Sequence, residues 1–556
     1  MKTLLKNSGF RAFLTTQFLG ALNDNLYKTI VSLRALQVAA SAGLDYLWLA
    51  GVVFVLPFLL FSGYSGHLAD KVSKRTVMIS VKVFEIGVMT IGLAVFFTDS
   101  MEWMLVVLFL MALHSTIFSP AKYGFVPELL EAKDLSRANG LLEMTTFVAI
   151  VMGTALSSFM FSAWDHDAWK MGVVMVSIAI IGLAVSYGIP RTAAVQNEDK
   201  FRWNPLGEVI TGTKHLLGDK PMWLTVIGIS YFWMLGALFQ LDLFFYGKDV
   251  LHVDEVKIGL MVTALAIGIG LGSLIAGKVS GDRVDLGLVP VGSALIGLFS
   301  IALAASKSSY AWSVAMLAAL GLASGLFIVP LNAFLQQRAE KGEKGRIIAT
   351  NNFYNTIGLM LAAGALWLFH DHLHISPDKL ILASGFATLA ATVYVVWLLP
   401  FHLVQLMLRV IIHTLFRIRA EGKSRVPLSG PALLVSNHVS FADGLLLRAA
   451  IDRNVRFLIW KPFFSNPVMA WVFGHINAIP VGDGPRGMVS ALVQAREELK
   501  QGHVVCIFAE GSITRTGHLH PFKRGLERIV KDIDVPVIPV HLDRLWGSVF
   551  RRVLFR

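Results

Sequence analysis

Residues 63–75 read GYSGHLADKVSKR, a glycine-rich and basic loop that closes one apolar run and precedes another. The stretch GKVSGDR at 277–283 repeats this plan after a later apolar run. The aspartates at 70 and 282 are 212 residues apart, and the prolines at 120 and 330 are 210 apart. A near-constant offset of this kind indicates two related halves within one chain.

Apolar runs of about 20 residues, the length that crosses a bilayer as a helix, recur up to residue 400. Of the 556 residues, 55% are hydrophobic and 15% are charged, whereas soluble domains carry about 25% charged residues. The sequence therefore predicts a polytopic α-helical membrane protein of two six-helix halves. The twelve expected spans lie near 10–38, 46–66, 75–97, 102–120, 139–163, 170–189, 222–246, 257–277, 287–305, 311–336, 348–369 and 379–400.

The polar breaks between these spans differ in charge. Breaks after even-numbered spans hold lysine and arginine, whereas breaks after odd-numbered spans are short and acidic or mixed. Because positive charge stays on the cytoplasmic side of a membrane, the N-terminus and the segment after Pro400 are both expected in the cytoplasm. No cleavable signal peptide is expected, because Asn23, Asp24 and Asn25 interrupt the first apolar run.

The loop at 63–75, with its repeat after the eighth span, resembles the signature loop of the major facilitator superfamily. In that family the loop holds helices together through charge pairs and contacts at helix ends. The resemblance implies that Gly66, Asp70 and Arg75 form a conformational lock.

Two ionisable residues lie within the predicted spans, where a charge is costly unless it faces a cavity or a partner. Asp24 falls in the first span, and Lys122 falls at the end of the fourth. A carboxylate and an ammonium in one bundle can pair with each other or respond to a cation. Two plainer alternatives stand beside this: Asp24 only locks neighbouring helices, and Lys122 reaches back to the membrane interface.

Three strings give a closer resemblance: SPAKYG at 119–124, RANGLLE at 137–143 and VPLNAFLQ at 329–336. They resemble the lysophospholipid transporters of Gram-negative bacteria over residues 8–400. The resemblance implies an inner-membrane flippase that moves lysophosphatidylethanolamine and related lysolipids from the outer to the inner leaflet. In that family a sodium gradient can drive transport. It also implies a set of residues along the transport path. These are Asp24, Asn25, Lys122, Gln240 and Asp242.

One position departs from that pattern. The transporter family can carry an arginine near Gln240, so the charge partner of the substrate or ion differs in this chain. An uncoupled flippase, which needs no ion gradient, therefore remains an alternative.

The character of the chain changes after residue 400. Residues 401–556 hold 21 Lys and Arg against 11 Asp and Glu, a balance that suits the anionic cytoplasmic leaflet. Nucleic acid is not expected as a partner, because the basic part adjoins a membrane domain. We expect three domains: the membrane bundle at 1–400, an interfacial amphipathic linker at 401–425, and a cytoplasmic α/β domain at 426–556 whose short apolar strands alternate with helices.

Polar motifs follow the predicted strands of this α/β domain. The string SNHVSFAD at 436–443 places His438 five residues before Asp443. The two side chains can meet only if His438 lies on the turn before a helix, where Asp443 would orient a ring ready to accept a proton. By spacing alone, a capping aspartate beside an unrelated histidine is the more common arrangement.

Further motifs favour the chemical interpretation. FAEGSITR at 508–515, FKRG at 522–525 and VPVIPV at 535–540 follow in order, and together they resemble the blocks of the glycerolipid acyltransferase family. The resemblance implies that His438 is the general base and that Asp443 orients it. It also implies a second set that positions the glycerol-phosphate of a lysolipid. These are Glu510, Gly511, Arg515 and Lys523.

Two positions depart from the acyltransferase pattern. Ala509 stands where the family usually has proline, and GHINAIPV at 474–481 lacks the arginine of the second block. This second string is more similar to acyltransferases that act on 2-acyl-glycerophosphoethanolamine than to those that act on lysophosphatidate. The chain also ends about 16 residues after Val540, early for this fold, which suggests a fragment or a short natural form.

The sequence thus predicts a flippase fused to an acyltransferase that reacylates lysophospholipid from an acyl thioester, either acyl-carrier protein or coenzyme A. No bound cofactor or metal is expected, and Cys506 is the one cysteine. A downstream ligase domain or protein that loads acyl-carrier protein is a possible partner. The alternatives are an exporter of drugs or metabolites with an inactive or unrelated tail, and a lysophosphatidate acyltransferase with a membrane anchor.

Overall fold

The computed structural model forms two compact units, residues 1–395 and 396–556. The division lies close to the expected boundary at residue 400. The residues that the structure describes are 2–42, 46–98, 100–164, 167–191, 204–281, 283–340, 342–415, 418–422, 425–427, 430–451, 453–514 and 516–545.

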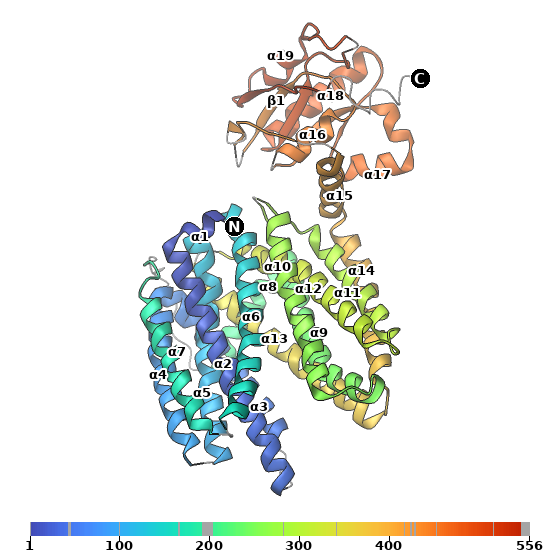
Figure 1. The fold of residues 1–556 in the computed structure, drawn as a ribbon. Coiled ribbons are helices and arrows are strands. Elements are labelled where there is room, and N and C mark those ends of the chain that lie inside the picture. Colours follow the sequence, from blue (N-terminus) through green and yellow to red (C-terminus); the bar gives the residue numbers. More distant parts are fainter. Residues whose placement is uncertain are drawn as a thin grey trace. The chain divides into compact units, whose positions relative to one another are not determined.

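The first unit is helical throughout its described length (Figure 1). Each of the twelve expected spans coincides with one long helix, and the ends agree to within about five residues except at the fourth span, whose helix continues to Leu129. Ten helices in the described part are long and apolar enough to cross a membrane; α2 is not among them, and α11 is a shorter apolar helix. The long helices are α2 (Ser8–Ala42), α3 (Tyr46–Lys71), α4 (Lys74–Phe96), α5 (Met101–Leu129), α6 (Leu135–Ala163), α7 (Ala168–Ser186), α9 (Lys220–Phe245), α10 (Glu255–Val279), α11 (Leu288–Ala304), α12 (Tyr310–Arg338), α13 (Lys344–Leu366) and α14 (Pro377–Leu398).

Shorter helices join or extend these. α1 (Lys2–Lys6) precedes the first long helix, η1 (Ala132–Asp134) precedes α6, and α8 (Pro205–Gly218) leads into the second half. A π-helical turn extends α9 and another extends α13. These turns are η2 (Tyr246–Val250) and η3 (Trp367–His372).

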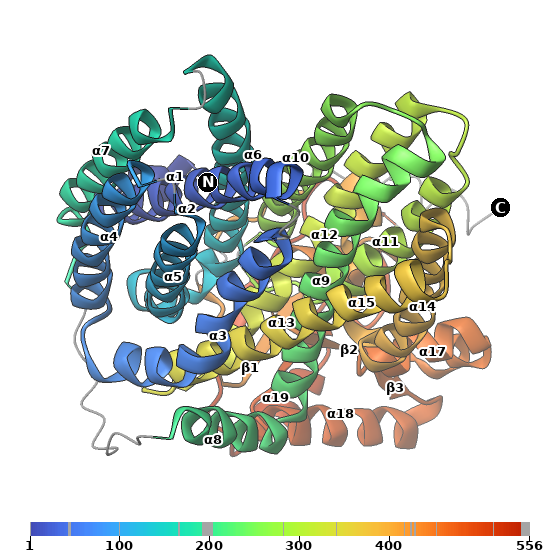
Figure 2. The same ribbon diagram turned by 90° about the horizontal axis from the view of Figure 1, so that it is seen from below.

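The long helices divide into two groups of six, α2 to α7 and α9 to α14. Figure 2 shows the first group in blue to teal on one side and the green helices of the second group on the other. α3 and α13 pack against each other across the division, as do α6 and α10. The architecture expected from the internal repeat is therefore confirmed.

Contacts between the halves gather at the end of the bundle that carries the α3–α4, α5–α6, α10–α11 and α12–α13 connections, which we call the basic end. Asp70, at the end of α3, accepts backbone hydrogen bonds from Gly345 at 2.6 Å and Arg346 at 2.8 Å, at the start of α13. A carboxylate is well placed at the N-terminus of a helix, where backbone N–H groups lack partners.

The other two residues of the expected lock, Gly66 and Arg75, make contacts of their own. A side chain at Gly66 would come within 2.7 Å of the Ala349 Cβ, so only glycine lets α3 approach α13 this closely. Arg75 stays within the first half, where it donates to the backbone oxygens of Ile189 at 2.6 Å and Tyr187 at 3.1 Å. The equivalent aspartate of the repeat, Asp282, lies outside the described residues.

A second pair of contacts closes the same end. Asn139 of α6 and Gln336 of α12 exchange two side-chain hydrogen bonds at 2.8 and 2.9 Å, and both residues are buried. The Ser136 hydroxyl donates to the backbone oxygen of Arg283 at 3.2 Å. The conformation is therefore one in which the halves are joined at the basic end.

The second unit begins with α15 (Pro400–Leu415) and contains a five-stranded parallel sheet in the order β3-β2-β4-β1-β5. Helices alternate with strands, as expected for an α/β domain. The strands are β1 (Ala432–Ser436), β2 (Val455–Trp460), β3 (Ile479–Val481), β4 (Val504–Phe508) and β5 (Val537–Val540). The helices are α16 (Asp443–Ala450), η5 (Lys461–Ser465), α17 (Pro467–His475), α18 (Gly484–Lys500) and α19 (Gly525–Val530).

Replacing Asp70 by alanine should loosen the basic end. The change leaves two backbone N–H groups of α13 without their charged acceptor, and each such bond is worth about 1.5–3 kcal/mol. In a Cys506→Ser background, a cysteine placed at Ala349, which is 1% exposed, should then react with a maleimide about tenfold faster or more. Glu131→Ala, which removes an exposed carboxylate near the same end, is the matched control and should leave the rate unchanged. An equal rate in Asp70→Ala would show that this contact does not hold the halves together.

Candidate functional site

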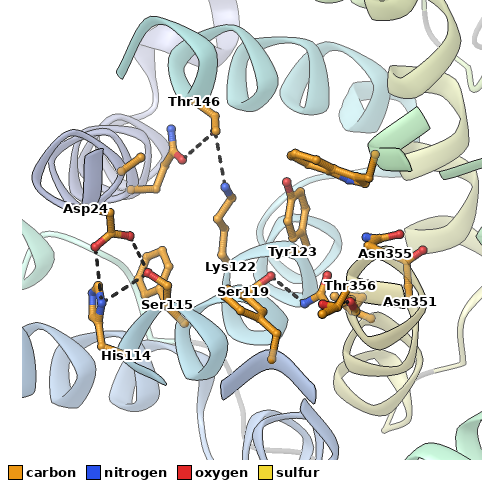
Figure 3. Close-up of a pocket in the computed structure, with 18 of the residues that line it drawn as sticks. Asp24, His114, Ser115, Ser119, Lys122, Tyr123, Thr146, Asn351, Asn355 and Thr356 are labelled. Carbon is orange, nitrogen blue, oxygen red and sulfur yellow. Dashed lines mark hydrogen bonds and ion pairs between the residues drawn. The ribbon is translucent and has the colours of Figure 1, made fainter. Parts of the chain in front are cut away.

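The first unit contains a cavity of about 300 Å³ that both halves line. Aromatic side chains from α3, α5 and α9 supply apolar surface, including Phe58, Phe118 and Trp233. Figure 3 shows the polar side: Asp24, His114 and Ser115 lie together, Lys122 points toward Thr146, and α13 presents Asn351 and Asn355. The cavity thus combines apolar walls with charged groups of both signs.

Asp24 is the one carboxylate among the described residues that line this cavity. The Ser115 hydroxyl donates a hydrogen bond to Asp24 Oδ2, and His114 Nδ1 lies 3.6 Å from Asp24 Oδ1. The Asp24 side chain is 18% exposed. A charged group that enters the cavity can therefore reach this carboxylate.

Lys122 lies across the same cavity. Its Nζ is 3.5 Å from Thr146 Oγ1 and 4.7 Å from the centre of the Tyr123 ring. Beside it, Glu143 accepts hydrogen bonds of 3.1 Å from the Tyr123 hydroxyl and the Asn332 amide. The Lys122 ammonium is thus turned into the bundle and lines the cavity wall.

Behind Asp24 lies a buried ionic cluster that the sequence analysis did not single out. Lys82 and Glu85 of α4 form an ion pair of 2.5 Å, and each side chain is 1% exposed. His114 Nε2 lies 3.4 Å from Glu85 Oε2, and the Asn23 amide donates to Glu85 Oε1 at 2.9 Å. The signal was present in the sequence, since Lys82, Glu85 and His114 are ionisable residues within apolar spans.

Three residues of the expected transport path do not line the cavity. Asn25 donates to the backbone oxygen of Ala21 on its own helix at 2.7 Å. Gln240 is exposed on α9. Asp242 is 1% exposed, and neither of its carboxylate oxygens has a hydrogen-bond partner among the described residues. These three residues are therefore not part of the candidate site in the cavity.

In the second unit, the expected motifs meet at one edge of the sheet. β1 and β4 are paired in register, with Ser436 opposite Phe508. His438 and Glu510 each follow two residues after these positions. Because the carboxyl ends of neighbouring parallel strands lie side by side, residues 72 positions apart contact each other there: the backbone N–H of His438 donates to Glu510 Oε1 at 2.8 Å.

His438 and Asp443 form the expected pair. His438 Nδ1 lies 2.8 Å from Asp443 Oδ2, which also accepts the backbone N–H groups of Val439 at 2.5 Å and Ser440 at 2.9 Å. Asp443 is fully buried at the start of α16, while the His438 side chain is 20% exposed. An Nδ1–H donated to Asp443 leaves the lone pair on Nε2, where it can accept a proton.

The His438 ring is also held on its face. It stacks on Phe508 at a centroid distance of 4.1 Å and an interplanar angle of 13°. Its backbone oxygen accepts from the Thr514 N–H at 2.9 Å. The imidazole is thus oriented before any substrate arrives.

Glu510 was expected to position substrate, and its observed contacts are with the backbone of two loops. It is 2% exposed, and its second oxygen accepts the backbone N–H of His520 at 2.8 Å. Since both carboxylate oxygens already accept backbone hydrogen bonds, the side chain joins the His438 loop to the loop that holds His520.

Gly511 and Lys523 lie close together at this edge. Gly511 has φ +71°, and a Cβ there would come within 2.8 Å of Lys523 Nζ. Glycine is therefore required both by its backbone angle and by the space that Lys523 occupies. The exposed Lys523 ammonium is available to an anionic group. Arg515, the remaining residue expected here, lies outside the described residues.

The cysteine is not a candidate nucleophile. Cys506 lies in β4 and is fully buried. Burial, aided by the nearby Asp443 charge, raises the pKa of its thiol, so a reactive thiolate does not form at neutral pH. The arrangement favours direct transfer assisted by His438 over a covalent enzyme intermediate on Cys506.

Curated relatives match the first unit. Lysophospholipid transporter LplT of Photorhabdus laumondii is 29% identical over 406 residues, which cover 71% of this chain and 96% of the relative. The protein of the same name from Klebsiella pneumoniae is 27% identical over 407 residues, covering 71% and 96%. That from Escherichia coli is 28% identical over 384 residues, covering 65% and 89%.

Solved structures show the same fold at low identity. FucP, the fucose:proton symporter of E. coli, aligns in its outward conformation with a TM-score of 0.57 at 12% identity, covering 70% of this chain and 98% of that one. A bacterial homologue of the iron transporter ferroportin in an outward-facing state gives 0.55 at 15% identity, covering 69% and 98%. The human organic anion transporter TETRAN gives 0.56 at 12%, covering 69% and 99%.

Family comparison agrees for both units. Residues 13–363 match the Major Facilitator Superfamily, and residues 417–543 match the Acyltransferase family. Both family resemblances seen in the sequence are thereby confirmed. The chain belongs to the Major Facilitator Superfamily and carries a C-terminal acyltransferase domain.

Proposed function

We propose that this protein moves lysophospholipid from the outer to the inner leaflet of a bacterial inner membrane and converts it there to diacyl phospholipid. The observation that carries the proposal is that one chain joins two parts. A bundle related to lysophospholipid transporters holds a charged cavity, and the acyltransferase domain holds an assembled His438–Asp443 pair.

The cavity suits a zwitterionic lysolipid such as lysophosphatidylethanolamine. Lys122 offers a cation to the phosphate, and Asp24 offers an anion to the ammonium of the headgroup. Phe58, Phe118 and Trp233 offer apolar surface to the single acyl chain. These groups support a lipid with one chain and a charged head better than a purely apolar or purely anionic substrate.

The acyltransferase site suits attack by a hydroxyl. His438 Nε2 accepts the proton of the free glycerol hydroxyl while that oxygen attacks the carbonyl carbon of the acyl thioester. The tetrahedral intermediate then collapses, the C–S bond breaks, and the departing thiolate receives the proton from the imidazolium. Asp443 holds the ring in place and stabilises its charged form. Lys523, beside Gly511, offers a cation to the lysolipid phosphate.

Either acyl-carrier protein or coenzyme A can supply the thioester, because the carbonyl and the leaving sulfur are the same in both. The ordered His438–Asp443 pair argues against an inactive tail on an exporter. A cavity with opposed charges argues against a bundle that serves only as an anchor.

The first test concerns orientation. If the basic loops are cytoplasmic, a cysteine at Glu421 in a Cys506→Ser background should react with an impermeant maleimide only after spheroplasts are permeabilised. A cysteine at Ser308, in the exposed α11–α12 connection, should react in intact spheroplasts. The reverse pattern would overturn the proposed topology.

The second test concerns transport. Asp24→Asn removes the cavity carboxylate and should lower lysophosphatidylethanolamine uptake in proteoliposomes by about tenfold or more, because a charged hydrogen bond is worth about 1.5–3 kcal/mol. Acylation of detergent-solubilised lysolipid should stay at the wild-type rate. Glu102→Gln, an exposed carboxylate variant of α5, is the control. Unchanged uptake by Asp24→Asn would assign Asp24 to helix packing alone.

The third test concerns acyl transfer. His438→Ala should lower the conversion of lysophosphatidylethanolamine to diacyl lipid by about 10²–10⁴-fold, the usual effect of losing a general base. Asp443→Asn should also lower it, because the ring loses its orienting partner. His475→Ala on α17 should retain activity, and none of these changes should alter uptake. A folded wild-type protein that shows no thioester-dependent conversion would exclude the enzymatic part of the proposal.

A further inference from the structure

The buried cluster of Lys82, Glu85 and His114 has no part in the function proposed so far, although it joins the cavity through Asp24. His114 is 2% exposed overall and lines the cavity, as does Lys82. Its ring therefore lies between Asp24 at the cavity wall (Figure 3) and Glu85 inside the first half of the bundle.

Both ring nitrogens of His114 face acceptors. Nδ1 lies 2.9 Å from the Met111 backbone oxygen and 3.6 Å from Asp24 Oδ1. Nε2 lies 3.4 Å from Glu85 Oε2. Ser115 Oγ is 3.3 Å from Nδ1, but its proton is donated to Asp24, so it too presents a lone pair. A neutral imidazole has one N–H and would turn a lone pair toward one of these acceptors. The surroundings thus match an imidazolium with a proton on each nitrogen.

The charge balance of the cluster also favours a protonated His114. Asp24 and Glu85 supply two negative charges, and Lys82 supplies one positive charge. A proton on His114 makes the group neutral, whereas its loss leaves a net negative charge in a desolvated site, which is costly.

Among the described residues, no carboxylate other than Asp24 and Glu85 lies within ion-pair distance of His114. α2 contributes Asp24, and α4 contributes Lys82 and Glu85. Among the described residues that line the cavity, those of α3 are apolar, and those of α13 are apolar, amide or hydroxyl side chains. On its own helix, Lys122 and Tyr123 line the same cavity.

We infer that His114 is the proton-binding site through which lysolipid movement is coupled to a proton gradient. The inference rests on the proposed transport function. With the halves joined at the basic end, a proton from water on the opposite side binds the imidazole between Asp24 and Glu85 and favours entry of the zwitterionic headgroup. When the basic end opens, the proton leaves to water on that side with the lysolipid, so that one proton crosses with each lipid.

A proton fits this site better than a sodium ion. The ring nitrogens fill the space between the two carboxylates, and Asp24 Oδ2 already accepts from Ser115. Sodium prefers several oxygen ligands, whereas Asp24 is the one carboxylate among the described residues of the cavity wall. Sodium dependence is therefore an outcome that the experiment must separate from proton dependence.

The experiment uses the full chain in proteoliposomes and measures the distribution of labelled lysophosphatidylethanolamine between the leaflets. No acyl donor is added, and pH and sodium gradients are imposed separately. With one proton per lipid, each pH unit should shift the leaflet ratio by about tenfold in the direction of proton flow, without sodium. His114→Gln should still equilibrate lysolipid but should lose this shift. His372→Gln, which changes an exposed histidine of η3, should keep it.

A second variant tests the charge balance. Glu85→Gln keeps the size of the side chain but removes the anion facing Nε2, so the cluster is neutral without the extra proton. Proton-dependent transport should then require more acidic conditions than in the wild type. The same pH profile in Glu85→Gln and wild type would contradict the inference, and it does so even if His114→Gln fails to fold.

The outcomes separate coupling from transport. A wild-type protein that equilibrates lysolipid but responds to no pH gradient, or responds to sodium alone, overturns the coupling and leaves the proposed transport intact. A wild-type protein that moves no lysolipid under any gradient overturns both.

Discussion

The contact of Asp70 with the start of α13 is the constraint on which the first unit depends. Two carboxylate oxygens accept the backbone N–H groups of Gly345 and Arg346, and thereby tie the last turn of α3 to the first turn of the eleventh long helix. The contact requires close approach, which Gly66 permits. With the halves joined at this end, residues from both line one shared cavity, so the polar site exists in this form only because the lock is made.

The second unit depends on strand register in a similar way. A shift of one residue between β1 and β4 would turn side chains at the strand ends toward the wrong face of the sheet. In the observed register, Glu510 accepts backbone hydrogen bonds from both His438 and His520. A buried carboxylate that serves two loops is sensitive to any such shift. The position of the base thus follows from the sheet and from Glu510 together, and Asp443 then sets the orientation of the ring.

The sequence was sufficient to locate the long helices, because a helix that crosses lipid needs about 20 consecutive, mainly apolar residues. It was sufficient for the His438–Asp443 pair as well, because both residues lie within one short turn. The sequence did not show which side chains of neighbouring helices face one another. Gln240 and Asp242 show why: residues two positions apart lie about 200° apart on a helix, so a pair taken together from a linear pattern cannot share one face. Gln240 is exposed, and Asp242 is buried away from the cavity.

The ionic cluster escaped prediction for a related reason. Lys82 and Glu85 are three residues apart and therefore neighbours on α4, but the approach of His114 and Asp24 comes from two other helices. Their meeting explains how so many charges are tolerated in an apolar bundle: each is balanced within the cluster.

On the proposed function, acylation by the second unit also affects the movement of lysolipid through the first. Even if the bundle only equilibrates lysolipid between the leaflets, acylation shifts that equilibrium inward by removing lysolipid from the inner leaflet. The added acyl chain holds the product in the membrane, because each additional buried methylene adds about 0.8 kcal/mol of membrane affinity. The diacyl product is then a poor ligand for a cavity whose polar wall suits a single chain and a charged head. Acyl transfer therefore makes inward movement effectively irreversible, and a proton at His114 acts one step earlier, by raising the amount of lysolipid available for it.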